Sequence, residues 1–474
     1  MREKRNEIVA FLAFAYFLTR LIFLLRLPIF NDEAIYLDWG NRIVSGGVSL
    51  FYPLFDGKTP VLMWVFGVFG KIFSDPLFAG RLVSVITGAV LLLGIYKTAD
   101  RLFGDKTAIV SSLFYIATPI FAFYDRQALM ETSVGAIGVW MFYFLLVYLE
   151  KFKTRDAVIC ALSLSLGFYI KPSAALFLVP YLLIISVEFV KKPDKRVRII
   201  NGLIVFSLAV LLSVLPLFVQ KNFPTIISRS NRYIGFPSLV GNFKNLSEIL
   251  FWQLFPVTLV LSLLGIFKTR KNLFMLIWVG LPLAITVFAS NSLSSRYVVS
   301  FLPLFSIFAA WGFVNVSKPI KPFAALTFGA LFWLIANPFA YLSLLNKLTL
   351  TSDFNSYYLS QTAGEAIKKV RQRLEKFAES GPILVGVRLD AGNPESAMFA
   401  YYGKNKNDRI MAVYFDKKII DTEGLDKISS PRPLYFVSRG ENLAGMDKYL
   451  TEKERLYNKG DNFFGIYTLK EEFK

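Results

Sequence analysis

The chain has 474 residues, of which 54% are hydrophobic and 16% aromatic, and it carries a formal net charge of +19. So apolar a composition excludes a single soluble domain of this length and indicates a protein that crosses the membrane several times. Because there is no histidine and only one cysteine, a Ser-His-Asp triad, a His-ligated zinc and a disulfide framework are also excluded. Lysine and arginine lie in short loops rather than on one basic face, so we expect no nucleic-acid partner.

Apolar stretches of roughly 17 to 25 residues recur along the chain and predict about eleven transmembrane helices. Lysine and arginine gather in alternate loops, so the positive-inside rule predicts a cytoplasmic N-terminus and, after an odd number of spans, a C-terminus outside the plasma membrane. The first span is expected to persist as an anchor, because no small-residue cleavage site follows it. The expected spans are Ile8–Leu27, Leu77–Thr98, Ala108–Phe123, Ser133–Leu149, Ala157–Ile170, Ser173–Val190, Ile199–Val219, Leu250–Phe267, Leu273–Ala289, Val298–Val316 and Phe323–Leu345.

The first outer loop, residues 28–76, carries two adjacent acids, Asp32 and Glu33, directly after the first span. An ionised carboxylate at such a place is costly to bury unless it is paired or hydrated. Apolar neighbours such as Phe30 and Tyr36 favour a carboxylate tuned to act as a base. A solvated pair of loop acids beside the membrane is the plainer interpretation.

The same outer loop contains two stretches, Ala34–Val44 and Val61–Phe73, with apolar residues at helical spacing. They are too short or too polar to span, so we expect helices lying at the membrane interface. Between them, Asp56–Pro60 is typical of a glycine turn followed by a proline that starts a helix. Such a turn would also hold the Lys58 ammonium near an anionic lipid phosphate, and the two interpretations are compatible.

Further cations fall on the predicted outer side, where positive charge is otherwise sparse: Arg126, Lys171 and Arg296. Together with Lys58 they indicate an anionic ligand. The alternatives are an ion pair between Arg126 and Glu131 within one loop, and simple snorkelling of Lys171 and Arg296 to the interface.

From about residue 351 the sequence becomes charged and mixed, which divides the chain into a membrane domain, residues 1–346, and a soluble domain, residues 351–474. A helix is expected over Thr362–Glu379, because Gly381 and a proline follow it. The alternation of such segments with short apolar runs predicts an extracytoplasmic α/β domain. The runs are Ile383–Val387, Ile410–Phe415, Leu434–Val437 and Phe463–Leu469.

The order of these motifs resembles the GT-C glycosyltransferases that use polyprenyl-phosphate sugars, in particular the protein O-mannosyltransferase and aminoarabinose-transferase-like group (glycosyltransferase families 39 and 83). Two positions depart from that family's pattern, because Thr59 stands in place of a proline and Glu131 in place of an aspartate. The C-terminal domain carries no matching motif. The resemblance covers the first two thirds of the chain and rests on Asn31–Ala34, Gly57–Val61, Arg126 with Glu131, Ile170–Ala174, and Arg296 with Tyr297.

The resemblance implies a polytopic α-helical protein of the GT-C fold. It implies an enzyme that transfers a sugar from a polyprenyl-phosphate carrier to an extracytoplasmic protein, lipid or glycan, with inversion at the sugar carbon. Asp32 would be the general base, and Glu33 would orient the substrate or tune Asp32. The implied phosphate ligands are Lys58, Arg126, Lys171 and Arg296, and the implied substrate-positioning residues are Glu131 and Tyr297.

No metal and no cofactor is expected from the resemblance, although Asp32, Glu33 and Glu131 offer the oxygen ligands that suit a divalent ion. A transporter or flippase of lipid-linked sugars is the main alternative. Against it, the ionisable residues gather in outer loops, and the chain shows no repeated half with paired broken helices. A non-enzymatic scaffold is a third class, but an anchor needs only one span. The sugar, the carrier length and the acceptor stay open.

Overall fold

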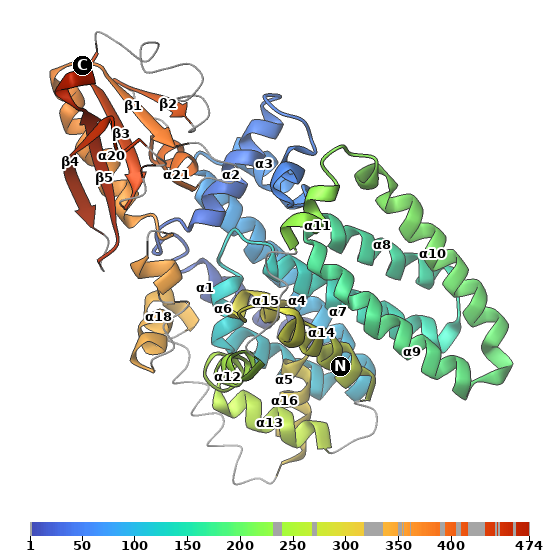
Figure 1. Ribbon diagram of the computed structural model, residues 1–474. Coiled ribbons are helices and arrows are strands. Elements are labelled where there is room, and N and C mark those ends of the chain that lie inside the picture. The colour runs from blue at the N-terminus through green and yellow to red at the C-terminus, as the bar shows by residue number, and fades with distance from the viewer. Residues whose placement is uncertain are drawn as a thin grey trace.

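The computed structural model describes a helical body followed by a small sheet domain (Figure 1). The residues that it describes are 2–230, 239–267, 273–316, 335–348, 353, 355–360, 362–388, 394–403, 409–415, 432–440, 443, 446–457 and 461–473.

Most of the expected spans are helices, as the apolar stretches predicted. By length and composition, four described helices are able to cross a membrane, or up to six if each of two bent pairs counts as one span. The predicted number of about eleven spans therefore stays a prediction. The matching helices are α1 (Arg2–Leu21), α4 (Pro76–Phe103), α5 (Asp105–Ala117), α6 (Pro119–Tyr124), α7 (Glu131–Lys151), α8 (Thr154–Ile170), α9 (Leu178–Lys191), α10 (Arg196–Phe218) and α14 (Leu273–Ala289).

Two expected spans, Leu250–Phe267 and Val298–Val316, are not single straight helices. The first is broken by a bend of 104° and the second by a bend of 60°. Pro256 and Pro303 lie at the breaks, and proline disfavours a helical residue before it and clashes with the preceding turn. Residues 323–334 of the last expected span lie outside the described residues. The elements are α12 (Leu239–Glu248), a π turn (Ile249–Gln253), α13 (Pro256–Phe267), α15 (Ser295–Val298), a 3-10 turn (Val299–Phe301), α16 (Phe305–Asn315) and α18 (Pro338–Lys347).

The two short helices expected in the first outer loop are present as α2 (Asn31–Val44) and α3 (Val61–Ile72). Their backbones touch at two glycines: a Cβ on Gly67 would lie 2.2 Å from the carbonyl oxygen of Gly40. No larger residue fits there without separating the helices. This close contact holds the loop as a compact helical hairpin.

The C-terminal domain is a five-stranded mixed sheet, as the α/β prediction required. Strand order is β2-β1-β3-β5-β4, with β1 parallel to β2 and β3, and with β5 antiparallel to β3 and β4. Strand β4 was not expected, because its sequence Leu-Thr-Glu-Lys-Glu-Arg-Leu-Tyr is charged and mostly exposed, as befits an edge strand. The strands are β1 (Ile383–Arg388), β2 (Ile410–Phe415), β3 (Leu434–Arg439), β4 (Leu450–Tyr457) and β5 (Phe463–Leu469), and the helices are α20 (Glu365–Phe377) and α21 (Pro394–Gly403).

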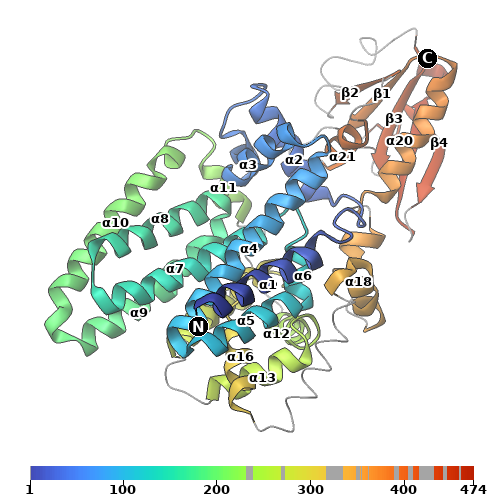
Figure 2. The ribbon, with the colours of Figure 1, turned by 180° about the vertical axis from the view of Figure 1, so that it is seen from behind.

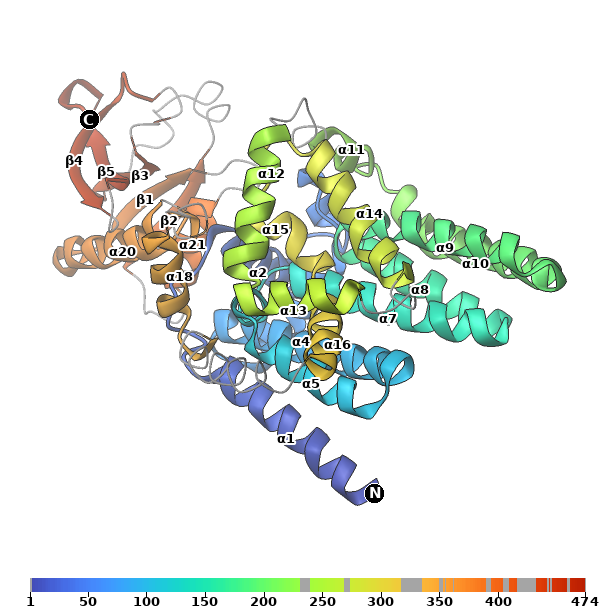
Figure 3. The same cartoon turned by 90° about the horizontal axis from the view of Figure 1, so that it is seen from below.

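The sheet domain sits at one end of the molecule, beside α2, and the α8 and α10 helices reach the other end (Figures 1 and 2). Figure 3 shows α1 running away from the sheet domain towards the N-terminus. A single apolar core joins the two parts, since Phe142 on α7 and Val385 on β1 both belong to it. Helix α21 packs against α2, so the sheet domain lies next to the loop that carries Asp32.

Candidate active site

Arg296 links two carboxylates that come from different parts of the chain. Its Nη1 donates to Asp32 Oδ2 at 2.8 Å, and its Nε donates to Glu131 Oε1 at 3.2 Å. Lys171 Nζ donates to the same Glu131 oxygen at 3.1 Å. Asp32, Lys171 and Arg296 remain about a fifth exposed, whereas Glu131 is buried. These four residues form one ion-pair network, and three of them are partly exposed.

Local sequence explains why these side chains meet. Asp32 and Glu131 stand in the first turns of α2 and α7, where the helix dipole favours negative charge. Lys171 ends α8 in an extended conformation, with φ −156° and ψ 129°, because Pro172 follows it. Arg296 lies in the four-residue helix α15. Tyr297 follows it and is half-buried against the core.

Lys58 is not bonded to this network and lies near Tyr36 instead. It forms an ion pair with Asp56, and its ammonium stands 5.9 Å from the ring centre of Tyr36 and 5.4 Å from that of Trp39. Asp56 also pairs with Arg229 at 3.3 Å. Burial raises the pKa of the Tyr36 hydroxyl well above its ordinary value, and the Asp32 charge adds to that rise. Tyr36 is therefore neutral, and its hydroxyl oxygen is placed to accept an N–H group of Arg296.

Glu33 points away from the network and is fully buried against Arg81. The Arg81 guanidinium donates to both carboxylate oxygens of Glu33, at 2.9 and 2.8 Å. Its remaining N–H groups donate to the carbonyls of residues 24, 27 and 28. Glu33 also accepts the backbone N–H groups of Phe30 and Ala128. Every donor of Arg81 is used, which is what makes a buried ion pair tolerable.

Arg126 is also buried, and the structure does not bring it into the network of Lys171 and Arg296. It donates to the backbone carbonyls of Thr19 and Ile335. The alternative of an ion pair between Arg126 and Glu131 is wrong among the described residues, because Glu131 is bonded by Lys171 and Arg296 instead.

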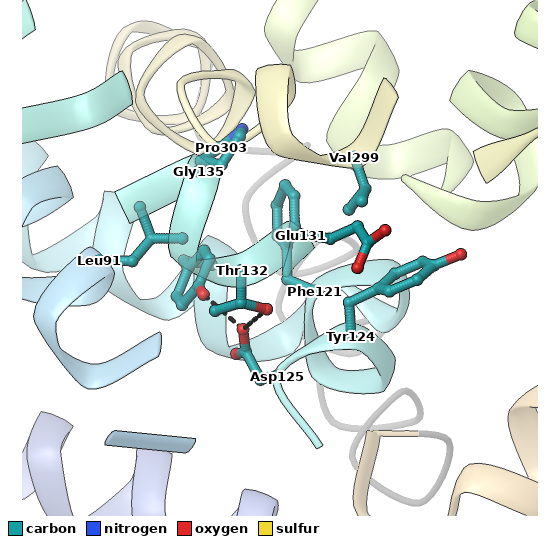
Figure 4. A pocket seen from close by; sticks show the side chains of 10 residues that line it. Leu91, Phe121, Tyr124, Asp125, Glu131, Thr132, Gly135, Val299 and Pro303 are labelled. Atoms are coloured by element: carbon teal, nitrogen blue, oxygen red, sulfur yellow. Dashed lines mark hydrogen bonds between the residues drawn. The ribbon is translucent and has the colours of Figure 1, made fainter. Parts of the chain in front are cut away.

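A small cavity lies behind Glu131 (Figure 4). Its polar lining includes Asp125 and Thr132, which are hydrogen-bonded at 3.3 Å, and the Tyr124 side chain. Glu131 Oε2 makes no hydrogen bond, although it is buried. One oxygen of Glu131 thus serves the two cations while the other is free to accept a proton donor.

The part of the chain that the structure describes contains no group of three or more acidic or cysteine side chains arranged to hold a metal ion. The arrangement sets two cations, Lys171 and Arg296, beside a partly exposed carboxylate, Asp32, and such cations can stabilise the charge of a bound anion.

Sequence reasoning missed two buried arginines that position the site. Arg81 holds Glu33, and Arg20 forms a buried ion pair with Asp125 at 3.1 Å. A signal was present, because each arginine interrupts an apolar stretch expected to span, and an ionisable residue there marks a partner or a function. Asp353 was also missed. The Ser295 hydroxyl donates to its carboxylate, at 2.8 and 2.7 Å from the two oxygens, and no local sequence pattern predicts this contact.

The fold and the site agree with a match in sequence. Residues 57–217 match the model of the family described as dolichyl-phosphate-mannose-protein mannosyltransferase. The chain is a membrane glycosyltransferase with the GT-C fold, so the class that the order of its motifs predicted is confirmed. No curated protein matches the chain by sequence.

Among solved structures, the chain is similar to ArnT from Cupriavidus metallidurans bound to undecaprenyl phosphate, with a TM-score of 0.63 and 14% identity over 97% of both chains. It is also similar to the oligosaccharyltransferase AglB from Archaeoglobus fulgidus in complex with an inhibitory peptide and a dolichol-phosphate. There the TM-score is 0.50 and the identity 15%, over 92% of this chain and 69% of that one. At such low identity the likeness establishes a shared fold.

Proposed function

We propose that the protein transfers a sugar from a polyprenyl-phosphate carrier to an acceptor on the outer side of the membrane. The observation that carries the proposal is the bridging of Asp32 and Glu131 by Arg296, at 2.8 and 3.2 Å, with Lys171 beside them. Of the similar structures, ArnT holds undecaprenyl phosphate and AglB holds a dolichol-phosphate, which supports a lipid phosphate here.

The reaction needs little from the protein, because phosphate is already a good leaving group. Asp32 takes the proton from the acceptor hydroxyl or amine as that atom bonds to the anomeric carbon of the sugar. The bond between that carbon and the phosphate oxygen breaks, and its electron pair stays on the phosphate. A single displacement of this kind inverts the anomeric centre.

Lys171 and Arg296 bind the phosphate and stabilise the charge that grows on it. When Arg296 turns towards the phosphate, its bond to Asp32 is given up, and the Asp32 carboxylate becomes available to the acceptor. Binding of the sugar donor therefore prepares the base. Lys58, whose ammonium lies near the Tyr36 ring, is the third cation in this proposal. It binds another oxygen of the same lipid phosphate.

The other residues named from the sequence take supporting roles in this proposal. Glu33 acts as a positioning residue, because its contacts with Arg81 and with Phe30 N–H hold the first turn of α2. Glu131 places the two cations. Arg126 contributes through its contacts with backbone carbonyls, and Tyr297 lines the substrate side of α15.

The proposed arrangement places residues 1–346 as the catalytic domain in a plasma membrane, with the N-terminus in the cytoplasm. Residues 351–474 then lie outside. Positive charge in alternate loops supports this orientation, as does the packing of α21 against α2, the helix that carries Asp32. No metal and no cofactor enters the proposed reaction.

The test is transfer of radiolabelled sugar from polyprenyl-phosphate sugars in membranes that carry the wild-type chain or Asp32→Asn. The matched control is Asp38→Asn, on the same helix, where the carboxylate pairs only with Arg42 among the described residues. We expect Asp32→Asn to abolish transfer and Asp38→Asn to preserve it. If both variants transfer sugar normally, Asp32 is not the base. If the wild-type chain moves lipid-linked sugars across vesicles without transferring them, a flippase replaces the proposal.

A further inference from the structure

One segment after the helical body contacts the residues that stand next to Asp32 and Arg296 in the chain. At its start, Asp353 accepts the Ser295 hydroxyl directly beside Arg296. At its end, the carbonyl of Thr362 accepts Asn31 N–H at 2.9 Å, next to Asp32, and Gly364 N–H donates to the carbonyl of residue 29 at 2.8 Å. The strand-like pairing of residues 30 and 363 continues this contact. The described residues of the segment 353–364 thus lie next to the candidate active site.

Tyr357 stands in the middle of that segment and is 3% exposed. Its ring packs against Phe30, with 4.4 Å between ring centres, and against Phe123 at 4.9 Å. Phe30 also faces the Arg296 guanidinium, which lies 5.5 Å from its ring centre. The neighbouring Tyr124 hydroxyl is engaged by Ser295 at 2.7 Å. Tyr357 therefore lies one ring away from the cation of the network.

Among the described residues the buried Tyr357 hydroxyl has no partner at hydrogen-bond geometry, and the neighbouring Tyr124 hydroxyl, which acts on it, already bonds Ser295. A buried hydroxyl without a partner is unfavourable, so such a group at the wall of a site is suited to a ligand. Burial raises the pKa of Tyr357, which keeps the hydroxyl protonated and able to donate. Phe30 contacts both the Tyr357 ring and the Arg296 guanidinium, so an anion held by Arg296 would lie near the segment that carries this hydroxyl.

We infer that Tyr357 is a binding residue for the sugar donor, and that its hydroxyl donates a hydrogen bond to an oxygen of the phosphate held by Arg296. The inference rests on the proposed function and adds to it a residue from the segment that joins the membrane body to the outer domain. It gives that segment a direct part in recognition of the lipid phosphate.

The test is binding of undecaprenyl phosphate, and of undecaprenol as the uncharged counterpart, to the purified full chain in detergent. Tyr357→Phe removes the hydroxyl and keeps the ring. The matched control is Tyr181→Phe. Tyr181, in α9, is also a buried tyrosine whose hydroxyl makes no hydrogen bond to a described residue, and its ring stacks on Phe206 of α10. We expect Tyr357→Phe to weaken binding of the phosphate about tenfold or more, as the loss of a hydrogen bond to a charged group predicts.

Binding of undecaprenol should not change in either variant, and the thermal stability of both should equal that of the wild-type chain or exceed it. Equal binding of undecaprenyl phosphate by wild type and Tyr357→Phe would overturn the inference alone. So would a loss of the same size in Tyr181→Phe, or a clear drop in the stability of Tyr357→Phe, because the hydroxyl would then act structurally. A wild-type chain that does not bind undecaprenyl phosphate would overturn the proposed function together with the inference.

Discussion

Arg296 Nη1 lies 2.8 Å from Asp32 Oδ2, although 264 positions separate the two residues in the sequence. The same guanidinium reaches Glu131 through its Nε. A planar group with several N–H donors in fixed directions can serve two carboxylates at once, which a lysine ammonium on a flexible stem does less well.

Arg296→Lys should therefore keep the positive charge but lose the simultaneous hydrogen bonds to Asp32 and Glu131. We expect the rate of sugar transfer to fall about a hundredfold, the usual effect of removing one aligned donor from a site that stabilises developing charge. Transfer kinetics with a polyprenyl-phosphate sugar would measure this. Arg101→Lys is the control, because Arg101 pairs with the exposed Glu150 away from the site. Normal transfer by Arg296→Lys would mean that Arg296 supplies charge alone.

Glu33→Gln should destabilise the fold. The change leaves the fully buried Arg81 charge without its partner, and breaking a buried pair on one side costs about 3–5 kcal/mol. Thermal unfolding in detergent would show a lower midpoint, whereas Glu150→Gln, at an exposed pair, should cost at most about 1 kcal/mol. A Glu33→Gln chain of normal stability that no longer transfers sugar would return Glu33 to a direct role in the reaction.

Gly67→Ala should separate α2 from α3, since the added carbon would lie 2.2 Å from the Gly40 carbonyl oxygen. Its natural control is Gly70→Ala on the same helix, where an added carbon meets no atom within 4 Å and the better helix propensity of alanine should slightly stabilise. We expect lower stability and lower transfer for Gly67→Ala only. Thermal unfolding and transfer assays on the two variants would measure this difference. Equal stability and equal transfer would mean that the contact between α2 and α3 tolerates an added carbon.

Asp353 should make stability depend on pH. Burial raises its pKa above the ordinary value of 3.8, more than its bond from Ser295 and the Arg296 charge lower it. The folded chain then holds a proton that the unfolded chain has lost, so this contribution to stability is complete below 3.8 and disappears as pH rises through the folded pKa. Asp353→Asn removes the effect. Thermal unfolding from just above 3.8 to neutral pH should show the variant gaining on the wild-type chain; parallel profiles would contradict the expectation.

Local patterns in the sequence were sufficient for much of the fold. Long apolar stretches predicted α4, α7 and α10, and helical spacing predicted α2 and α3, because these features depend on neighbouring residues alone. Breaks inside Leu250–Phe267 and Val298–Val316 were missed, although Pro256 and Pro303 were visible. A proline in an apolar stretch is compatible with a continuous membrane helix, so only packing decides whether the chain bends.

The sequence by itself determined which side chains were available for chemistry: without histidine, acid/base work falls to Asp, Glu, Lys or Tyr, and the cations of the predicted outer loops indicated an anionic ligand. Only the tertiary structure decided how adjacent residues divide their tasks. Asp32 and Glu33 are neighbours in the chain, yet consecutive residues of a helix point in different directions. The Asp32 carboxylate therefore pairs with Arg296 in the partly exposed network, and the Glu33 carboxylate pairs with Arg81 in the core. Which cation each would find depended on helices that are far away in the sequence.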